Sequence, residues 1–205
     1  MPKPHWEKIY TEKQADAVSW FQPRAETSLA MIAAAGIAKE DAVIDVGGGA
    51  SRLVDDLVGQ GYSDVTVLDI SAAALEVSQQ RLPNVNVKWL EADITQADLP
   101  SAHYALWHDR AVFHFLTEAP LRRKYVEAAR AALKPRGHIV IATFAEDGPE
   151  TCSGLPVVRY SPENLLAEFG GGFDMLDTRR ETHKTPFGTE QKFIYCRFRL
   201  KANFC

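Results

Sequence analysis

The sequence predicts an α/β fold built on a mostly parallel sheet with helices on both faces. From about residue 25 onward, helical and strand-like patterns alternate, which is typical of parallel strands joined by helices. The segment 138–144, HIVIATF, is apolar at nearly every position, as expected for a central strand covered on both faces. With 205 residues, 46% apolar and 24% charged, the chain has the size and composition of one globular domain.

Short apolar runs bounded by turn residues mark the expected strands. We expect strands at 42–46, 65–69, 85–90, 104–107, 138–144, 173–178 and 192–200. The connection between the last two is too short to hold a crossover helix, so these two strands should run antiparallel.

Helices are expected between the strands, several with recognisable end signals. They cover 25–36, 52–60, 72–81, 121–133 and 162–169. Gly36 stops the first, Ser71 is a typical N-cap for the third, and the Lys-Pro-Arg-Gly run 134–137 ends the fourth. The first thirty residues look irregular, and their four aromatic residues should fold back over another part of the molecule: Trp6, Tyr10, Trp20 and Phe21.

Charge and cysteine content argue against several classes of function. The formal net charge is −4, from 23 Lys and Arg against 27 Asp and Glu, whereas nucleic-acid grooves and anionic membranes attract basic proteins. We expect no targeting segment and no membrane span, because no apolar stretch near the start is long enough. Cys152, Cys196 and Cys205 have no framework spacing, which favours reduced thiols in a cytoplasmic protein.

The segment 43–51, Val-Ile-Asp-Val-Gly-Gly-Gly-Ala-Ser, is the most informative motif. It reads as a strand, a glycine turn and the start of a helix. Glycines let the backbone pass close to a ligand, and the free N–H groups at a helix start face it. This pattern favours a nucleotide-binding crevice, with a tight turn that binds nothing as the alternative.

Three acidic residues follow three successive strands. Asp45 lies two residues before the first glycine, Asp69 ends the second strand, and Asp93 follows the third. The carboxyl ends of parallel strands meet at one edge of a sheet, where Asp69 can bind both hydroxyls of a ribose. Asp93 can accept a hydrogen bond from the amino group of an adenine, so the three acids predict one adenine-nucleoside site.

The position of Asp45 helps to identify the ligand. A dinucleotide would bring its pyrophosphate to the glycine turn, where Asp45 would repel it, and Arg52 replaces the last glycine of G-x-G-x-x-G. A ligand with an ammonium and a sulfonium suits Asp45 better, and S-adenosylmethionine carries both. A nicotinamide or nucleotide-sugar enzyme on a doubly wound sheet remains the alternative.

These motifs resemble those of class I S-adenosylmethionine-dependent methyltransferases. The resemblance covers residues 5–200, and its strongest parts are IDVGGGAS at 44–51, LDIS at 68–71 and EADI at 91–94. It implies a Rossmann-like sheet of seven strands with an antiparallel last strand. It also implies that the methionine part contacts Asp45 and the glycine turn, the ribose Asp69, and the adenine Ile70, Asp93 and Ile94. In full, the expected donor site is Asp45, Gly47, Gly48, Gly49, Asp69, Ile70, Asp93, Ile94, Trp20 and His108.

A narrower resemblance is to the elongation-factor lysine methyltransferases and their bacterial relatives. It is carried by Trp6–Tyr10, by 107–114 (WHDRAVFH) and by 123–126 (RKYV). Those enzymes carry Asp-Lys-Gly-Thr-Phe-Asp after the fourth strand, where residues 109–114 here are Asp-Arg-Ala-Val-Phe-His. Because these acceptor-facing positions differ, a protein lysine is an alternative acceptor rather than the first choice.

Methyl transfer is an in-line displacement, so the enzyme mainly has to align donor and acceptor, and a base is needed only where the acceptor must lose a proton. We predict His114 as that general base, with Asp109 orienting it or binding the donor's ammonium. The alternative is that the histidines here satisfy backbone groups at the strand end and that Arg110 pairs with Asp109. Expected acceptor contacts are Arg110, His114, Cys152, Arg159 and Tyr160. Arg159 could instead tie its loop to Glu146 or Asp147. No standard metal spacing is present, and we expect no metal.

The expected function is therefore methyl transfer from S-adenosylmethionine to an oxygen, nitrogen or sulfur atom of an acceptor. A small molecule is favoured, because no added recognition domain is visible, while the acidic run 146–150 would suit a protein lysine. A protein that binds the donor without turnover is a further alternative. We expect one domain over 1–205, with an arm or lid at 1–30 and an acceptor-side loop at 146–160, and no nucleic-acid or membrane partner.

Overall fold

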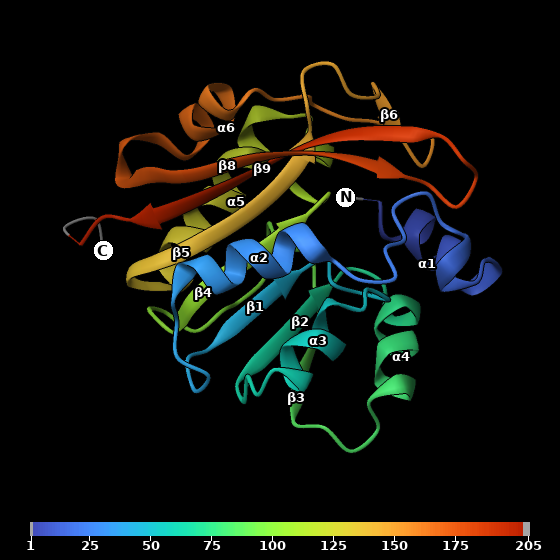
Figure 1. Cartoon of the computed structure of the whole chain (residues 1–205), viewed down its shortest axis with the longest axis horizontal. Coiled ribbons are helices and arrows are strands. Elements are labelled where there is room, and N and C mark those ends of the chain that lie inside the picture. The colour runs from blue at the N-terminus through green and yellow to red at the C-terminus, as the bar shows by residue number, and fades with distance from the viewer. Residues whose placement is uncertain (1, 203–205) are drawn as a thin grey trace.

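The structure, a computed structural model, describes residues 2–202, and seven of the strands in that range form one sheet (Figure 1). Their order is β3-β2-β1-β4-β5-β9-β8. The first five run parallel, and β9 runs antiparallel to both of its neighbours, β5 and β8. The sheet strands are β1 (Val43–Val46), β2 (Val65–Asp69), β3 (Val87–Glu91), β4 (Tyr104–Arg110), β5 (Leu133–Phe144), β8 (Phe173–Lys184) and β9 (Glu190–Leu200). The predicted seven-stranded sheet with its antiparallel last strand is confirmed.

Helices cover both faces of this sheet. Figure 1 shows α2 in front of the sheet and α5 behind it. Side chains of α2, α3 and α4 share one apolar core, and those of α5 and α6 share the other. The helices are α1 (Lys3–Glu12), α2 (Glu26–Ala35), α3 (Leu53–Gly59), α4 (Ala72–Arg81), α5 (Ala119–Ala132) and α6 (Pro162–Phe169). None of the helices described in residues 2–202 has both the length and the apolar character needed to cross a membrane.

The strand order creates a crevice beside β1. The chain passes from β1 outward through β2 and β3, then returns to the other side of β1 with β4. Helices that follow neighbouring strands on opposite sides of such a reversal diverge, which leaves a ligand-sized gap at the carboxyl ends of the strands. In the β1–β4 register, Asp45 lies beside His108, so both residues stand at this gap.

The N-terminal segment differs from the expectation, because Lys3–Glu12 is a regular helix. Its sequence is mostly polar, and only Trp6 and Ile9 are buried. A ten-residue helix with so few apolar residues is not stable in isolation, so packing against the rest of the molecule must support it. Ile70 and Val18 supply part of that packing.

Two strands are longer than their apolar patterns indicate. The strand β4 continues through His108 and Arg110. Polar residues such as these are typical of loops, but here their side chains form hydrogen bonds with buried groups. The strand β5 begins directly after α5, so the run 134–137 lies inside it rather than in a separate turn. Between β5 and α6, residues Thr151–Cys152 (β6) and Leu155–Pro156 (β7) form a small hairpin in the predicted acceptor-side loop.

Candidate active site

Two adjoining cavities lie at the carboxyl ends of β1, β2 and β4. The empty space in them, counted together with the open solvent at their mouths, is about 600 and 570 Å³. The first is lined by Asp69, Ile70 and Ile94, and the second by Asp45 and His108. Both share four lining residues, Tyr10, Trp20, Gly47 and Arg110, so they form the two halves of one elongated site.

The glycine turn lies against the carboxylates of both halves. A Cβ atom at Gly48 would stand 2.5 Å from Oδ2 of Asp45, and one at Gly49 would stand 2.5 Å from Oδ2 of Asp69. Gly47 has a φ of +71°, and a side chain there would collide with Val112. These contacts explain the three glycines: a side chain at Gly48 or Gly49 would displace an acid that borders a cavity, and one at Gly47 would displace Val112.

Asp45 is held by a buried chain of hydrogen bonds. Its Oδ1 lies 2.7 Å from Nδ1 of His108, and Nε2 of His108 lies 2.9 Å from Oγ of Ser28. Since a carboxylate only accepts, Nδ1 donates to Asp45, and Nε2 of a neutral ring accepts from the Ser28 hydroxyl. Oδ2 of Asp45 is buried and has no hydrogen-bond partner among the described residues. This oxygen is therefore available to a donor group of a ligand.

Asp69 closes the second strand beside the first cavity. Burial raises the pKa of its carboxyl to about 7, and the negative charges of Asp45 and Glu7 add to that rise. The backbone N–H of Ser71 opposes the rise by donating to Oδ1 at 2.9 Å. A ligand that donates further hydrogen bonds to this carboxylate would favour its ionised form.

The third predicted acid lies beside the first cavity rather than on its described wall. Oδ1 of Asp93 accepts from the backbone N–H and the hydroxyl of Thr95, at 2.9 and 2.8 Å. Its neighbours Ala92 and Ile94 line the cavity in its place. Ile94 and Ile70 thus border the first cavity with apolar surface, as an adenine would require.

Helix α1 forms a roof over the site. Trp6 and Tyr10, one turn apart on α1, line the first cavity together with Trp20 and Phe115. The ring centroid of Trp6 lies 5.7 Å from that of Trp20 and 5.0 Å from that of Phe115, both edge-on. Nε1 of Trp20 donates to the Tyr10 hydroxyl at 3.1 Å. The sequence indicated the aromatic residues of the N-terminal segment, but their helical arrangement and the contribution of Phe115 emerge only from the fold.

Polar contacts fasten this roof at three points. They join Glu7 to Ser71, Lys3 to Glu91, and His5 to Ser153. The first contact lies at the start of α4, the second at the end of β3, and the third at the turn of the β6–β7 hairpin. No sequence signal identified Glu7, because its partners are 64 or more residues away.

The two residues predicted to be catalytic lie outside the described walls of both cavities. Side chains alternate across a strand, so Asp109 faces α5 while its neighbours His108 and Arg110 face the cavities. Asp109 accepts from the Tyr125 hydroxyl at 2.6 Å and from the backbone N–H groups of Val112 and Phe113. It therefore organises the turn after β4.

His114 is fully buried behind the site. Burial lowers the pKa of its imidazole to about 3, and the nearby positive charge of Arg110 acts in the same direction. Nδ1 accepts the backbone N–H of Phe144 at 3.4 Å. A neutral imidazole at this position packs between Phe115 and Phe144, and we do not retain it as the general base.

Of the predicted acceptor contacts, Arg110 and Cys152 line the first cavity. Burial raises the pKa of the Cys152 thiol to about 12, so the thiol stays protonated at neutral pH.

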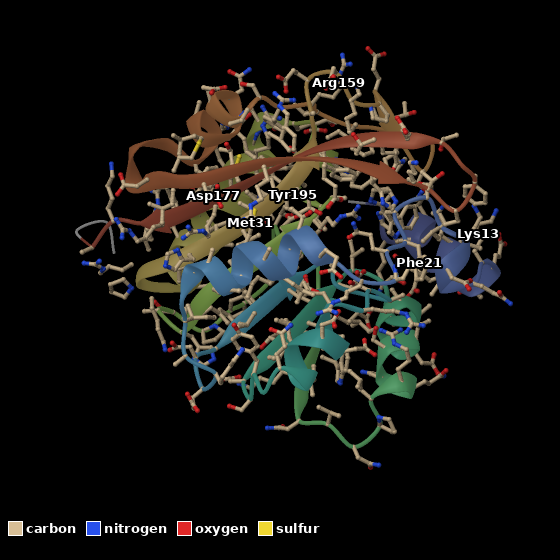
Figure 2. The ribbon with its side chains drawn as sticks, viewed as in Figure 1. Lys13, Phe21, Met31, Arg159, Asp177 and Tyr195 are labelled. Carbon is tan, nitrogen blue, oxygen red and sulfur yellow. The ribbon has the colours of Figure 1, made fainter. Side chains whose placement is uncertain are left out.

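Arg159 lies away from both cavities, at the outer surface in Figure 2, where it binds Glu150 at 3.0 Å and the carbonyl of Gly148. It ties its own loop together, as the alternative interpretation expected, although through Glu150. Tyr160 is buried in the core behind the site.

Other predictions concern metals and thiols. No group of three or more His, Cys, Asp or Glu side chains within residues 2–202 is arranged to hold a metal ion. Cys152 and Cys196 are buried free thiols, and Cys205 lies outside the described residues.

Comparison with known proteins identifies the fold and the domain. Residues 43–137 match the family model described as a methyltransferase domain. An uncharacterized methyltransferase of Mycobacterium tuberculosis is 31% identical over 113 residues, which are 55% of this chain and 54% of that protein. The EEF1A lysine methyltransferase 2 of Danio rerio is 24% identical over 151 residues, 70% of this chain and 59% of that one. The chain thus matches little more than half the length of these curated relatives.

A solved structure extends the match across nearly the whole fold. The 1,6-didemethyltoxoflavin-N1-methyltransferase of Burkholderia thailandensis, with bound 1,6-didemethyltoxoflavin and S-adenosylhomocysteine, superposes with a TM-score of 0.71. The alignment covers 97% of this chain and 84% of that one, at 18% identity. Residues 43–137 therefore match a methyltransferase domain, and the chain as a whole shares the fold of a methyltransferase solved with S-adenosylhomocysteine.

Proposed function

We propose that the chain transfers the methyl group of S-adenosylmethionine to a small-molecule acceptor. The observation that carries this proposal is the placing of two buried carboxylates, Asp45 and Asp69, against one glycine turn, each bordering one half of an elongated cavity. The spare oxygen of Asp45 suits an ammonium, and Asp69 suits a pair of ribose hydroxyls. S-adenosylmethionine carries both an ammonium and a ribose.

The residues of the chain hold and align the reactants. Asp69 binds the ribose, Ile70 and Ile94 border the adenine, and Asp45 binds the ammonium. The donor supplies a methyl carbon activated by its sulfonium. A lone pair of the acceptor forms the new bond to that carbon while the carbon–sulfur bond breaks and its electrons return to sulfur, and any acceptor proton leaves to solvent. The aromatic roof of Trp6, Tyr10 and Trp20 excludes water from this step.

The enclosure of the first cavity favours a small acceptor over a protein side chain. Helix α1 and the β6–β7 hairpin meet over the cavity, where Nε2 of His5 lies 3.2 Å from Oγ of Ser153. The guanidinium of Arg110 on the cavity wall would repel the ammonium of a lysine. We accordingly propose residues 1–30 as a lid and residues 146–160, through Cys152, as part of the acceptor wall of one methyltransferase domain.

The relatives supply the competing acceptor. The Danio rerio protein is named for a lysine of EEF1A, while the Burkholderia thailandensis protein is named for 1,6-didemethyltoxoflavin. A protein lysine therefore stays the alternative, and so does a protein that binds the donor without turnover. A cytoplasmic location is also part of the proposal, supported by the buried free thiols of Cys152 and Cys196.

Calorimetric titration with S-adenosylhomocysteine tests the donor site. We expect micromolar binding by the unaltered protein, and loss of that binding in Asp69→Ala. Asp64→Ala is the matched control, because Asp64 stands at the opposite end of β2 and pairs with Lys88. Binding of reduced nicotinamide dinucleotide in place of the sulfur ligand would overturn the proposal.

A screen with radiolabelled methyl donor then compares small acids, thiols and heterocycles with elongation-factor peptides. Labelling of peptides alone would favour the lysine alternative, and labelling of no acceptor would favour donor binding without turnover.

A further inference from the structure

The polar side chains on the wall of the first cavity are nearly all hydrogen-bond donors. Apart from Asp69, which is proposed to bind the ribose, those among its described lining residues are Trp6, Tyr10, Trp20, Arg110 and Cys152. An indole N–H and a guanidinium can only donate. Burial raises the pKa of the Tyr10 hydroxyl and of the Cys152 thiol, so both keep their protons. Such a wall favours a ligand that is rich in hydrogen-bond acceptors.

Two of these donors are buried and have no acceptor among the described residues. They are Nε1 of Trp6 and Nη2 of Arg110. The indole of Trp20, by contrast, already donates to the Tyr10 hydroxyl at 3.1 Å. A buried N–H group without an acceptor is unfavourable, and a ligand that accepts a hydrogen bond from it removes the penalty. The cavity that Trp6 and Arg110 both line is the place for such a ligand.

Arg110 is held firmly in this wall. Its Nε donates to the Tyr195 hydroxyl and its Nη1 to the carbonyl of Trp20, both at 3.0 Å. The guanidinium also stacks on the ring of Phe193, 4.4 Å from its centroid. Tyr195 itself is buried in the interior of the molecule (Figure 2), so the support of the guanidinium is internal. Because these two hydrogen bonds use only part of the five N–H groups of a guanidinium, the rest are open to a ligand.

One carboxylate approaches the guanidinium without occupying it. Oε1 of Glu181 lies 3.7 Å from Nη2 of Arg110, which is too far for a hydrogen bond. The same oxygen accepts from Nε2 of Gln22 at 3.0 Å and from the Tyr195 hydroxyl at 3.3 Å. The side chain of Arg110 is only 10% exposed, so water screens its charge poorly. A buried guanidinium with open N–H groups binds a planar anion well, and a carboxylate matches its geometry.

Aromatic rings determine the shape of ligand that suits the same cavity. Trp6, Tyr10, Trp20 and Phe115 all line it. Trp20 connects them, since its ring meets both Trp6 and Tyr10 edge-on, the latter with a centroid distance of 6.3 Å. Flat aromatic ligands pack against such rings in offset or edge-on contacts. The ligand that fits is therefore flat and aromatic.

An aromatic ring that carries a carboxylate meets both requirements. We propose that the methyl acceptor is a planar aromatic carboxylate bound in the first cavity, with Arg110 holding its carboxylate and Trp6 donating a hydrogen bond to it. This inference rests on the proposed function and specifies the class of acceptor that the proposed function leaves open. Arg110 and Trp6 then act as specificity-determining residues on the acceptor side.

Three probes of nearly equal shape and different charge test the acceptor class. Benzoate is anionic, benzamide is neutral and benzamidine is cationic. Each is titrated calorimetrically into protein that is saturated with S-adenosylhomocysteine. We expect benzoate to bind at least about tenfold more tightly than benzamide, as a hydrogen bond to a charged group implies, and benzamidine to bind most weakly. Cyclohexanecarboxylate, which has the charge but no flat ring, should bind more weakly than benzoate.

The donor titration separates failure of this inference from failure of the proposed function. If S-adenosylhomocysteine binds but benzoate binds no better than benzamide, the acceptor class is overturned while the donor site stands. The same conclusion follows if none of the three probes binds. If S-adenosylhomocysteine itself does not bind, the proposed function falls and this inference falls with it.

Variants of the two donors assign the contacts. In Arg110→Gln, the affinity for benzoate should fall to that for benzamide, while the affinity for benzamide changes by less than about twofold. Trp6→Phe keeps a ring and removes the N–H, so benzoate and benzamide should both bind about threefold to tenfold more weakly. Arg180→Gln, at an exposed pair with Glu146, is the charge-matched control and should leave all three affinities unchanged.

The affinity for S-adenosylhomocysteine decides whether Arg110 serves the acceptor. Arg110→Gln should keep this affinity within about threefold of that of the unaltered protein. A loss of donor affinity with unchanged binding of benzoate would overturn the assignment, and equal losses for benzoate and benzamide would show that Arg110 only supports the fold. If this variant does not fold, Arg110→Lys decides, because it keeps the charge and loses the planar fork. It should bind benzoate less tightly than the unaltered protein and still prefer benzoate to benzamide, and an unchanged affinity for benzoate would contradict the contact.

Discussion

The carboxylate of Glu7 accepts a hydrogen bond from the hydroxyl of Ser71 at 2.7 Å, and so joins the first helix to the start of α4. The same carboxylate accepts the backbone N–H groups of Ala72 and Ala73 at 3.0 and 3.1 Å. Ser71 in turn donates its own N–H to Asp69. One residue therefore connects the roof of the site to the carboxylate proposed to hold the ribose.

Removing this contact should loosen the roof without disturbing the sheet. In Glu7→Ala, Ser71 is the remaining cap for the N–H groups at the start of α4. The docking of α1 onto the rest of the molecule should lose about 1–2 kcal/mol of free energy. We expect faster hydrogen exchange in residues 3–12 and an affinity for S-adenosylhomocysteine lower by about fivefold to thirtyfold. Glu12→Ala, at the exposed far end of α1, is the matched control. Unchanged exchange in residues 3–12 would show that aromatic packing alone holds the helix.

Donor affinity should depend on pH through Asp69. In the free protein, burial raises the pKa of this carboxyl to about 7, whereas hydrogen bonds from ribose hydroxyls favour the ionised form and lower that pKa on binding. Binding therefore releases a proton below about pH 7. As the pH is lowered further, the affinity for the donor falls by up to about tenfold for each pH unit. Calorimetry at pH 6 in two buffers of different ionisation enthalpy measures the proton released. Affinity that is constant between pH 8 and pH 5.5 would contradict a contact between this carboxylate and the ligand.

The ionised carboxyl of Asp69 should destabilise the ligand-free protein at neutral and higher pH. A buried acid with a raised pKa stabilises the fold while it is protonated, and that contribution is lost as pH rises from about 4, its unfolded pKa, to about 7. Asp69→Asn keeps the shape and abolishes the charge. We expect this variant to melt at a higher temperature than the unaltered protein at pH 8 and at nearly the same temperature near pH 4. Calorimetric melting across this range checks the difference, and a variant less stable at pH 8 would contradict it.

Asp109 should prove important for folding rather than for turnover. Asp109→Ala leaves two buried backbone N–H groups and the Tyr125 hydroxyl without their acceptor, at a cost of about 3–5 kcal/mol. Tyr125→Phe removes one of the three donors and should cost about 1 kcal/mol. Urea unfolding measures both. In the folded fraction of either variant we expect donor affinity within about twofold of the original, because Asp109 borders neither cavity in the described structure. Full stability of Asp109→Ala combined with lost turnover would restore the catalytic interpretation.

Local sequence patterns predict much of the fold. The strand–turn–helix unit at 43–51 is confirmed because short apolar runs and glycines act locally, and Ser71 caps α4 as its position indicated. The N-terminal helix was not predicted, because its stability comes from distant partners such as Ile70 and Phe115. The sequence also indicated the wrong side chains at the end of β4 for the active site, for a related reason. Whether His108 or Asp109 faces the site depends on strand alternation, and spacing alone does not reveal which face is covered by α5.

The roof also bears on the rate of each catalytic cycle. In the proposed function, α1 lies beside the exit of the first cavity, held by its contacts with Ser71, Glu91 and Ser153 and lining the cavity with Trp6 and Tyr10. We expect release of the spent donor past α1 to be slower than chemistry on an activated methyl group. Turnover should begin with a burst of methylated product equal to the number of enzyme molecules, and the steady rate should rise when the hold of Glu7 is weakened.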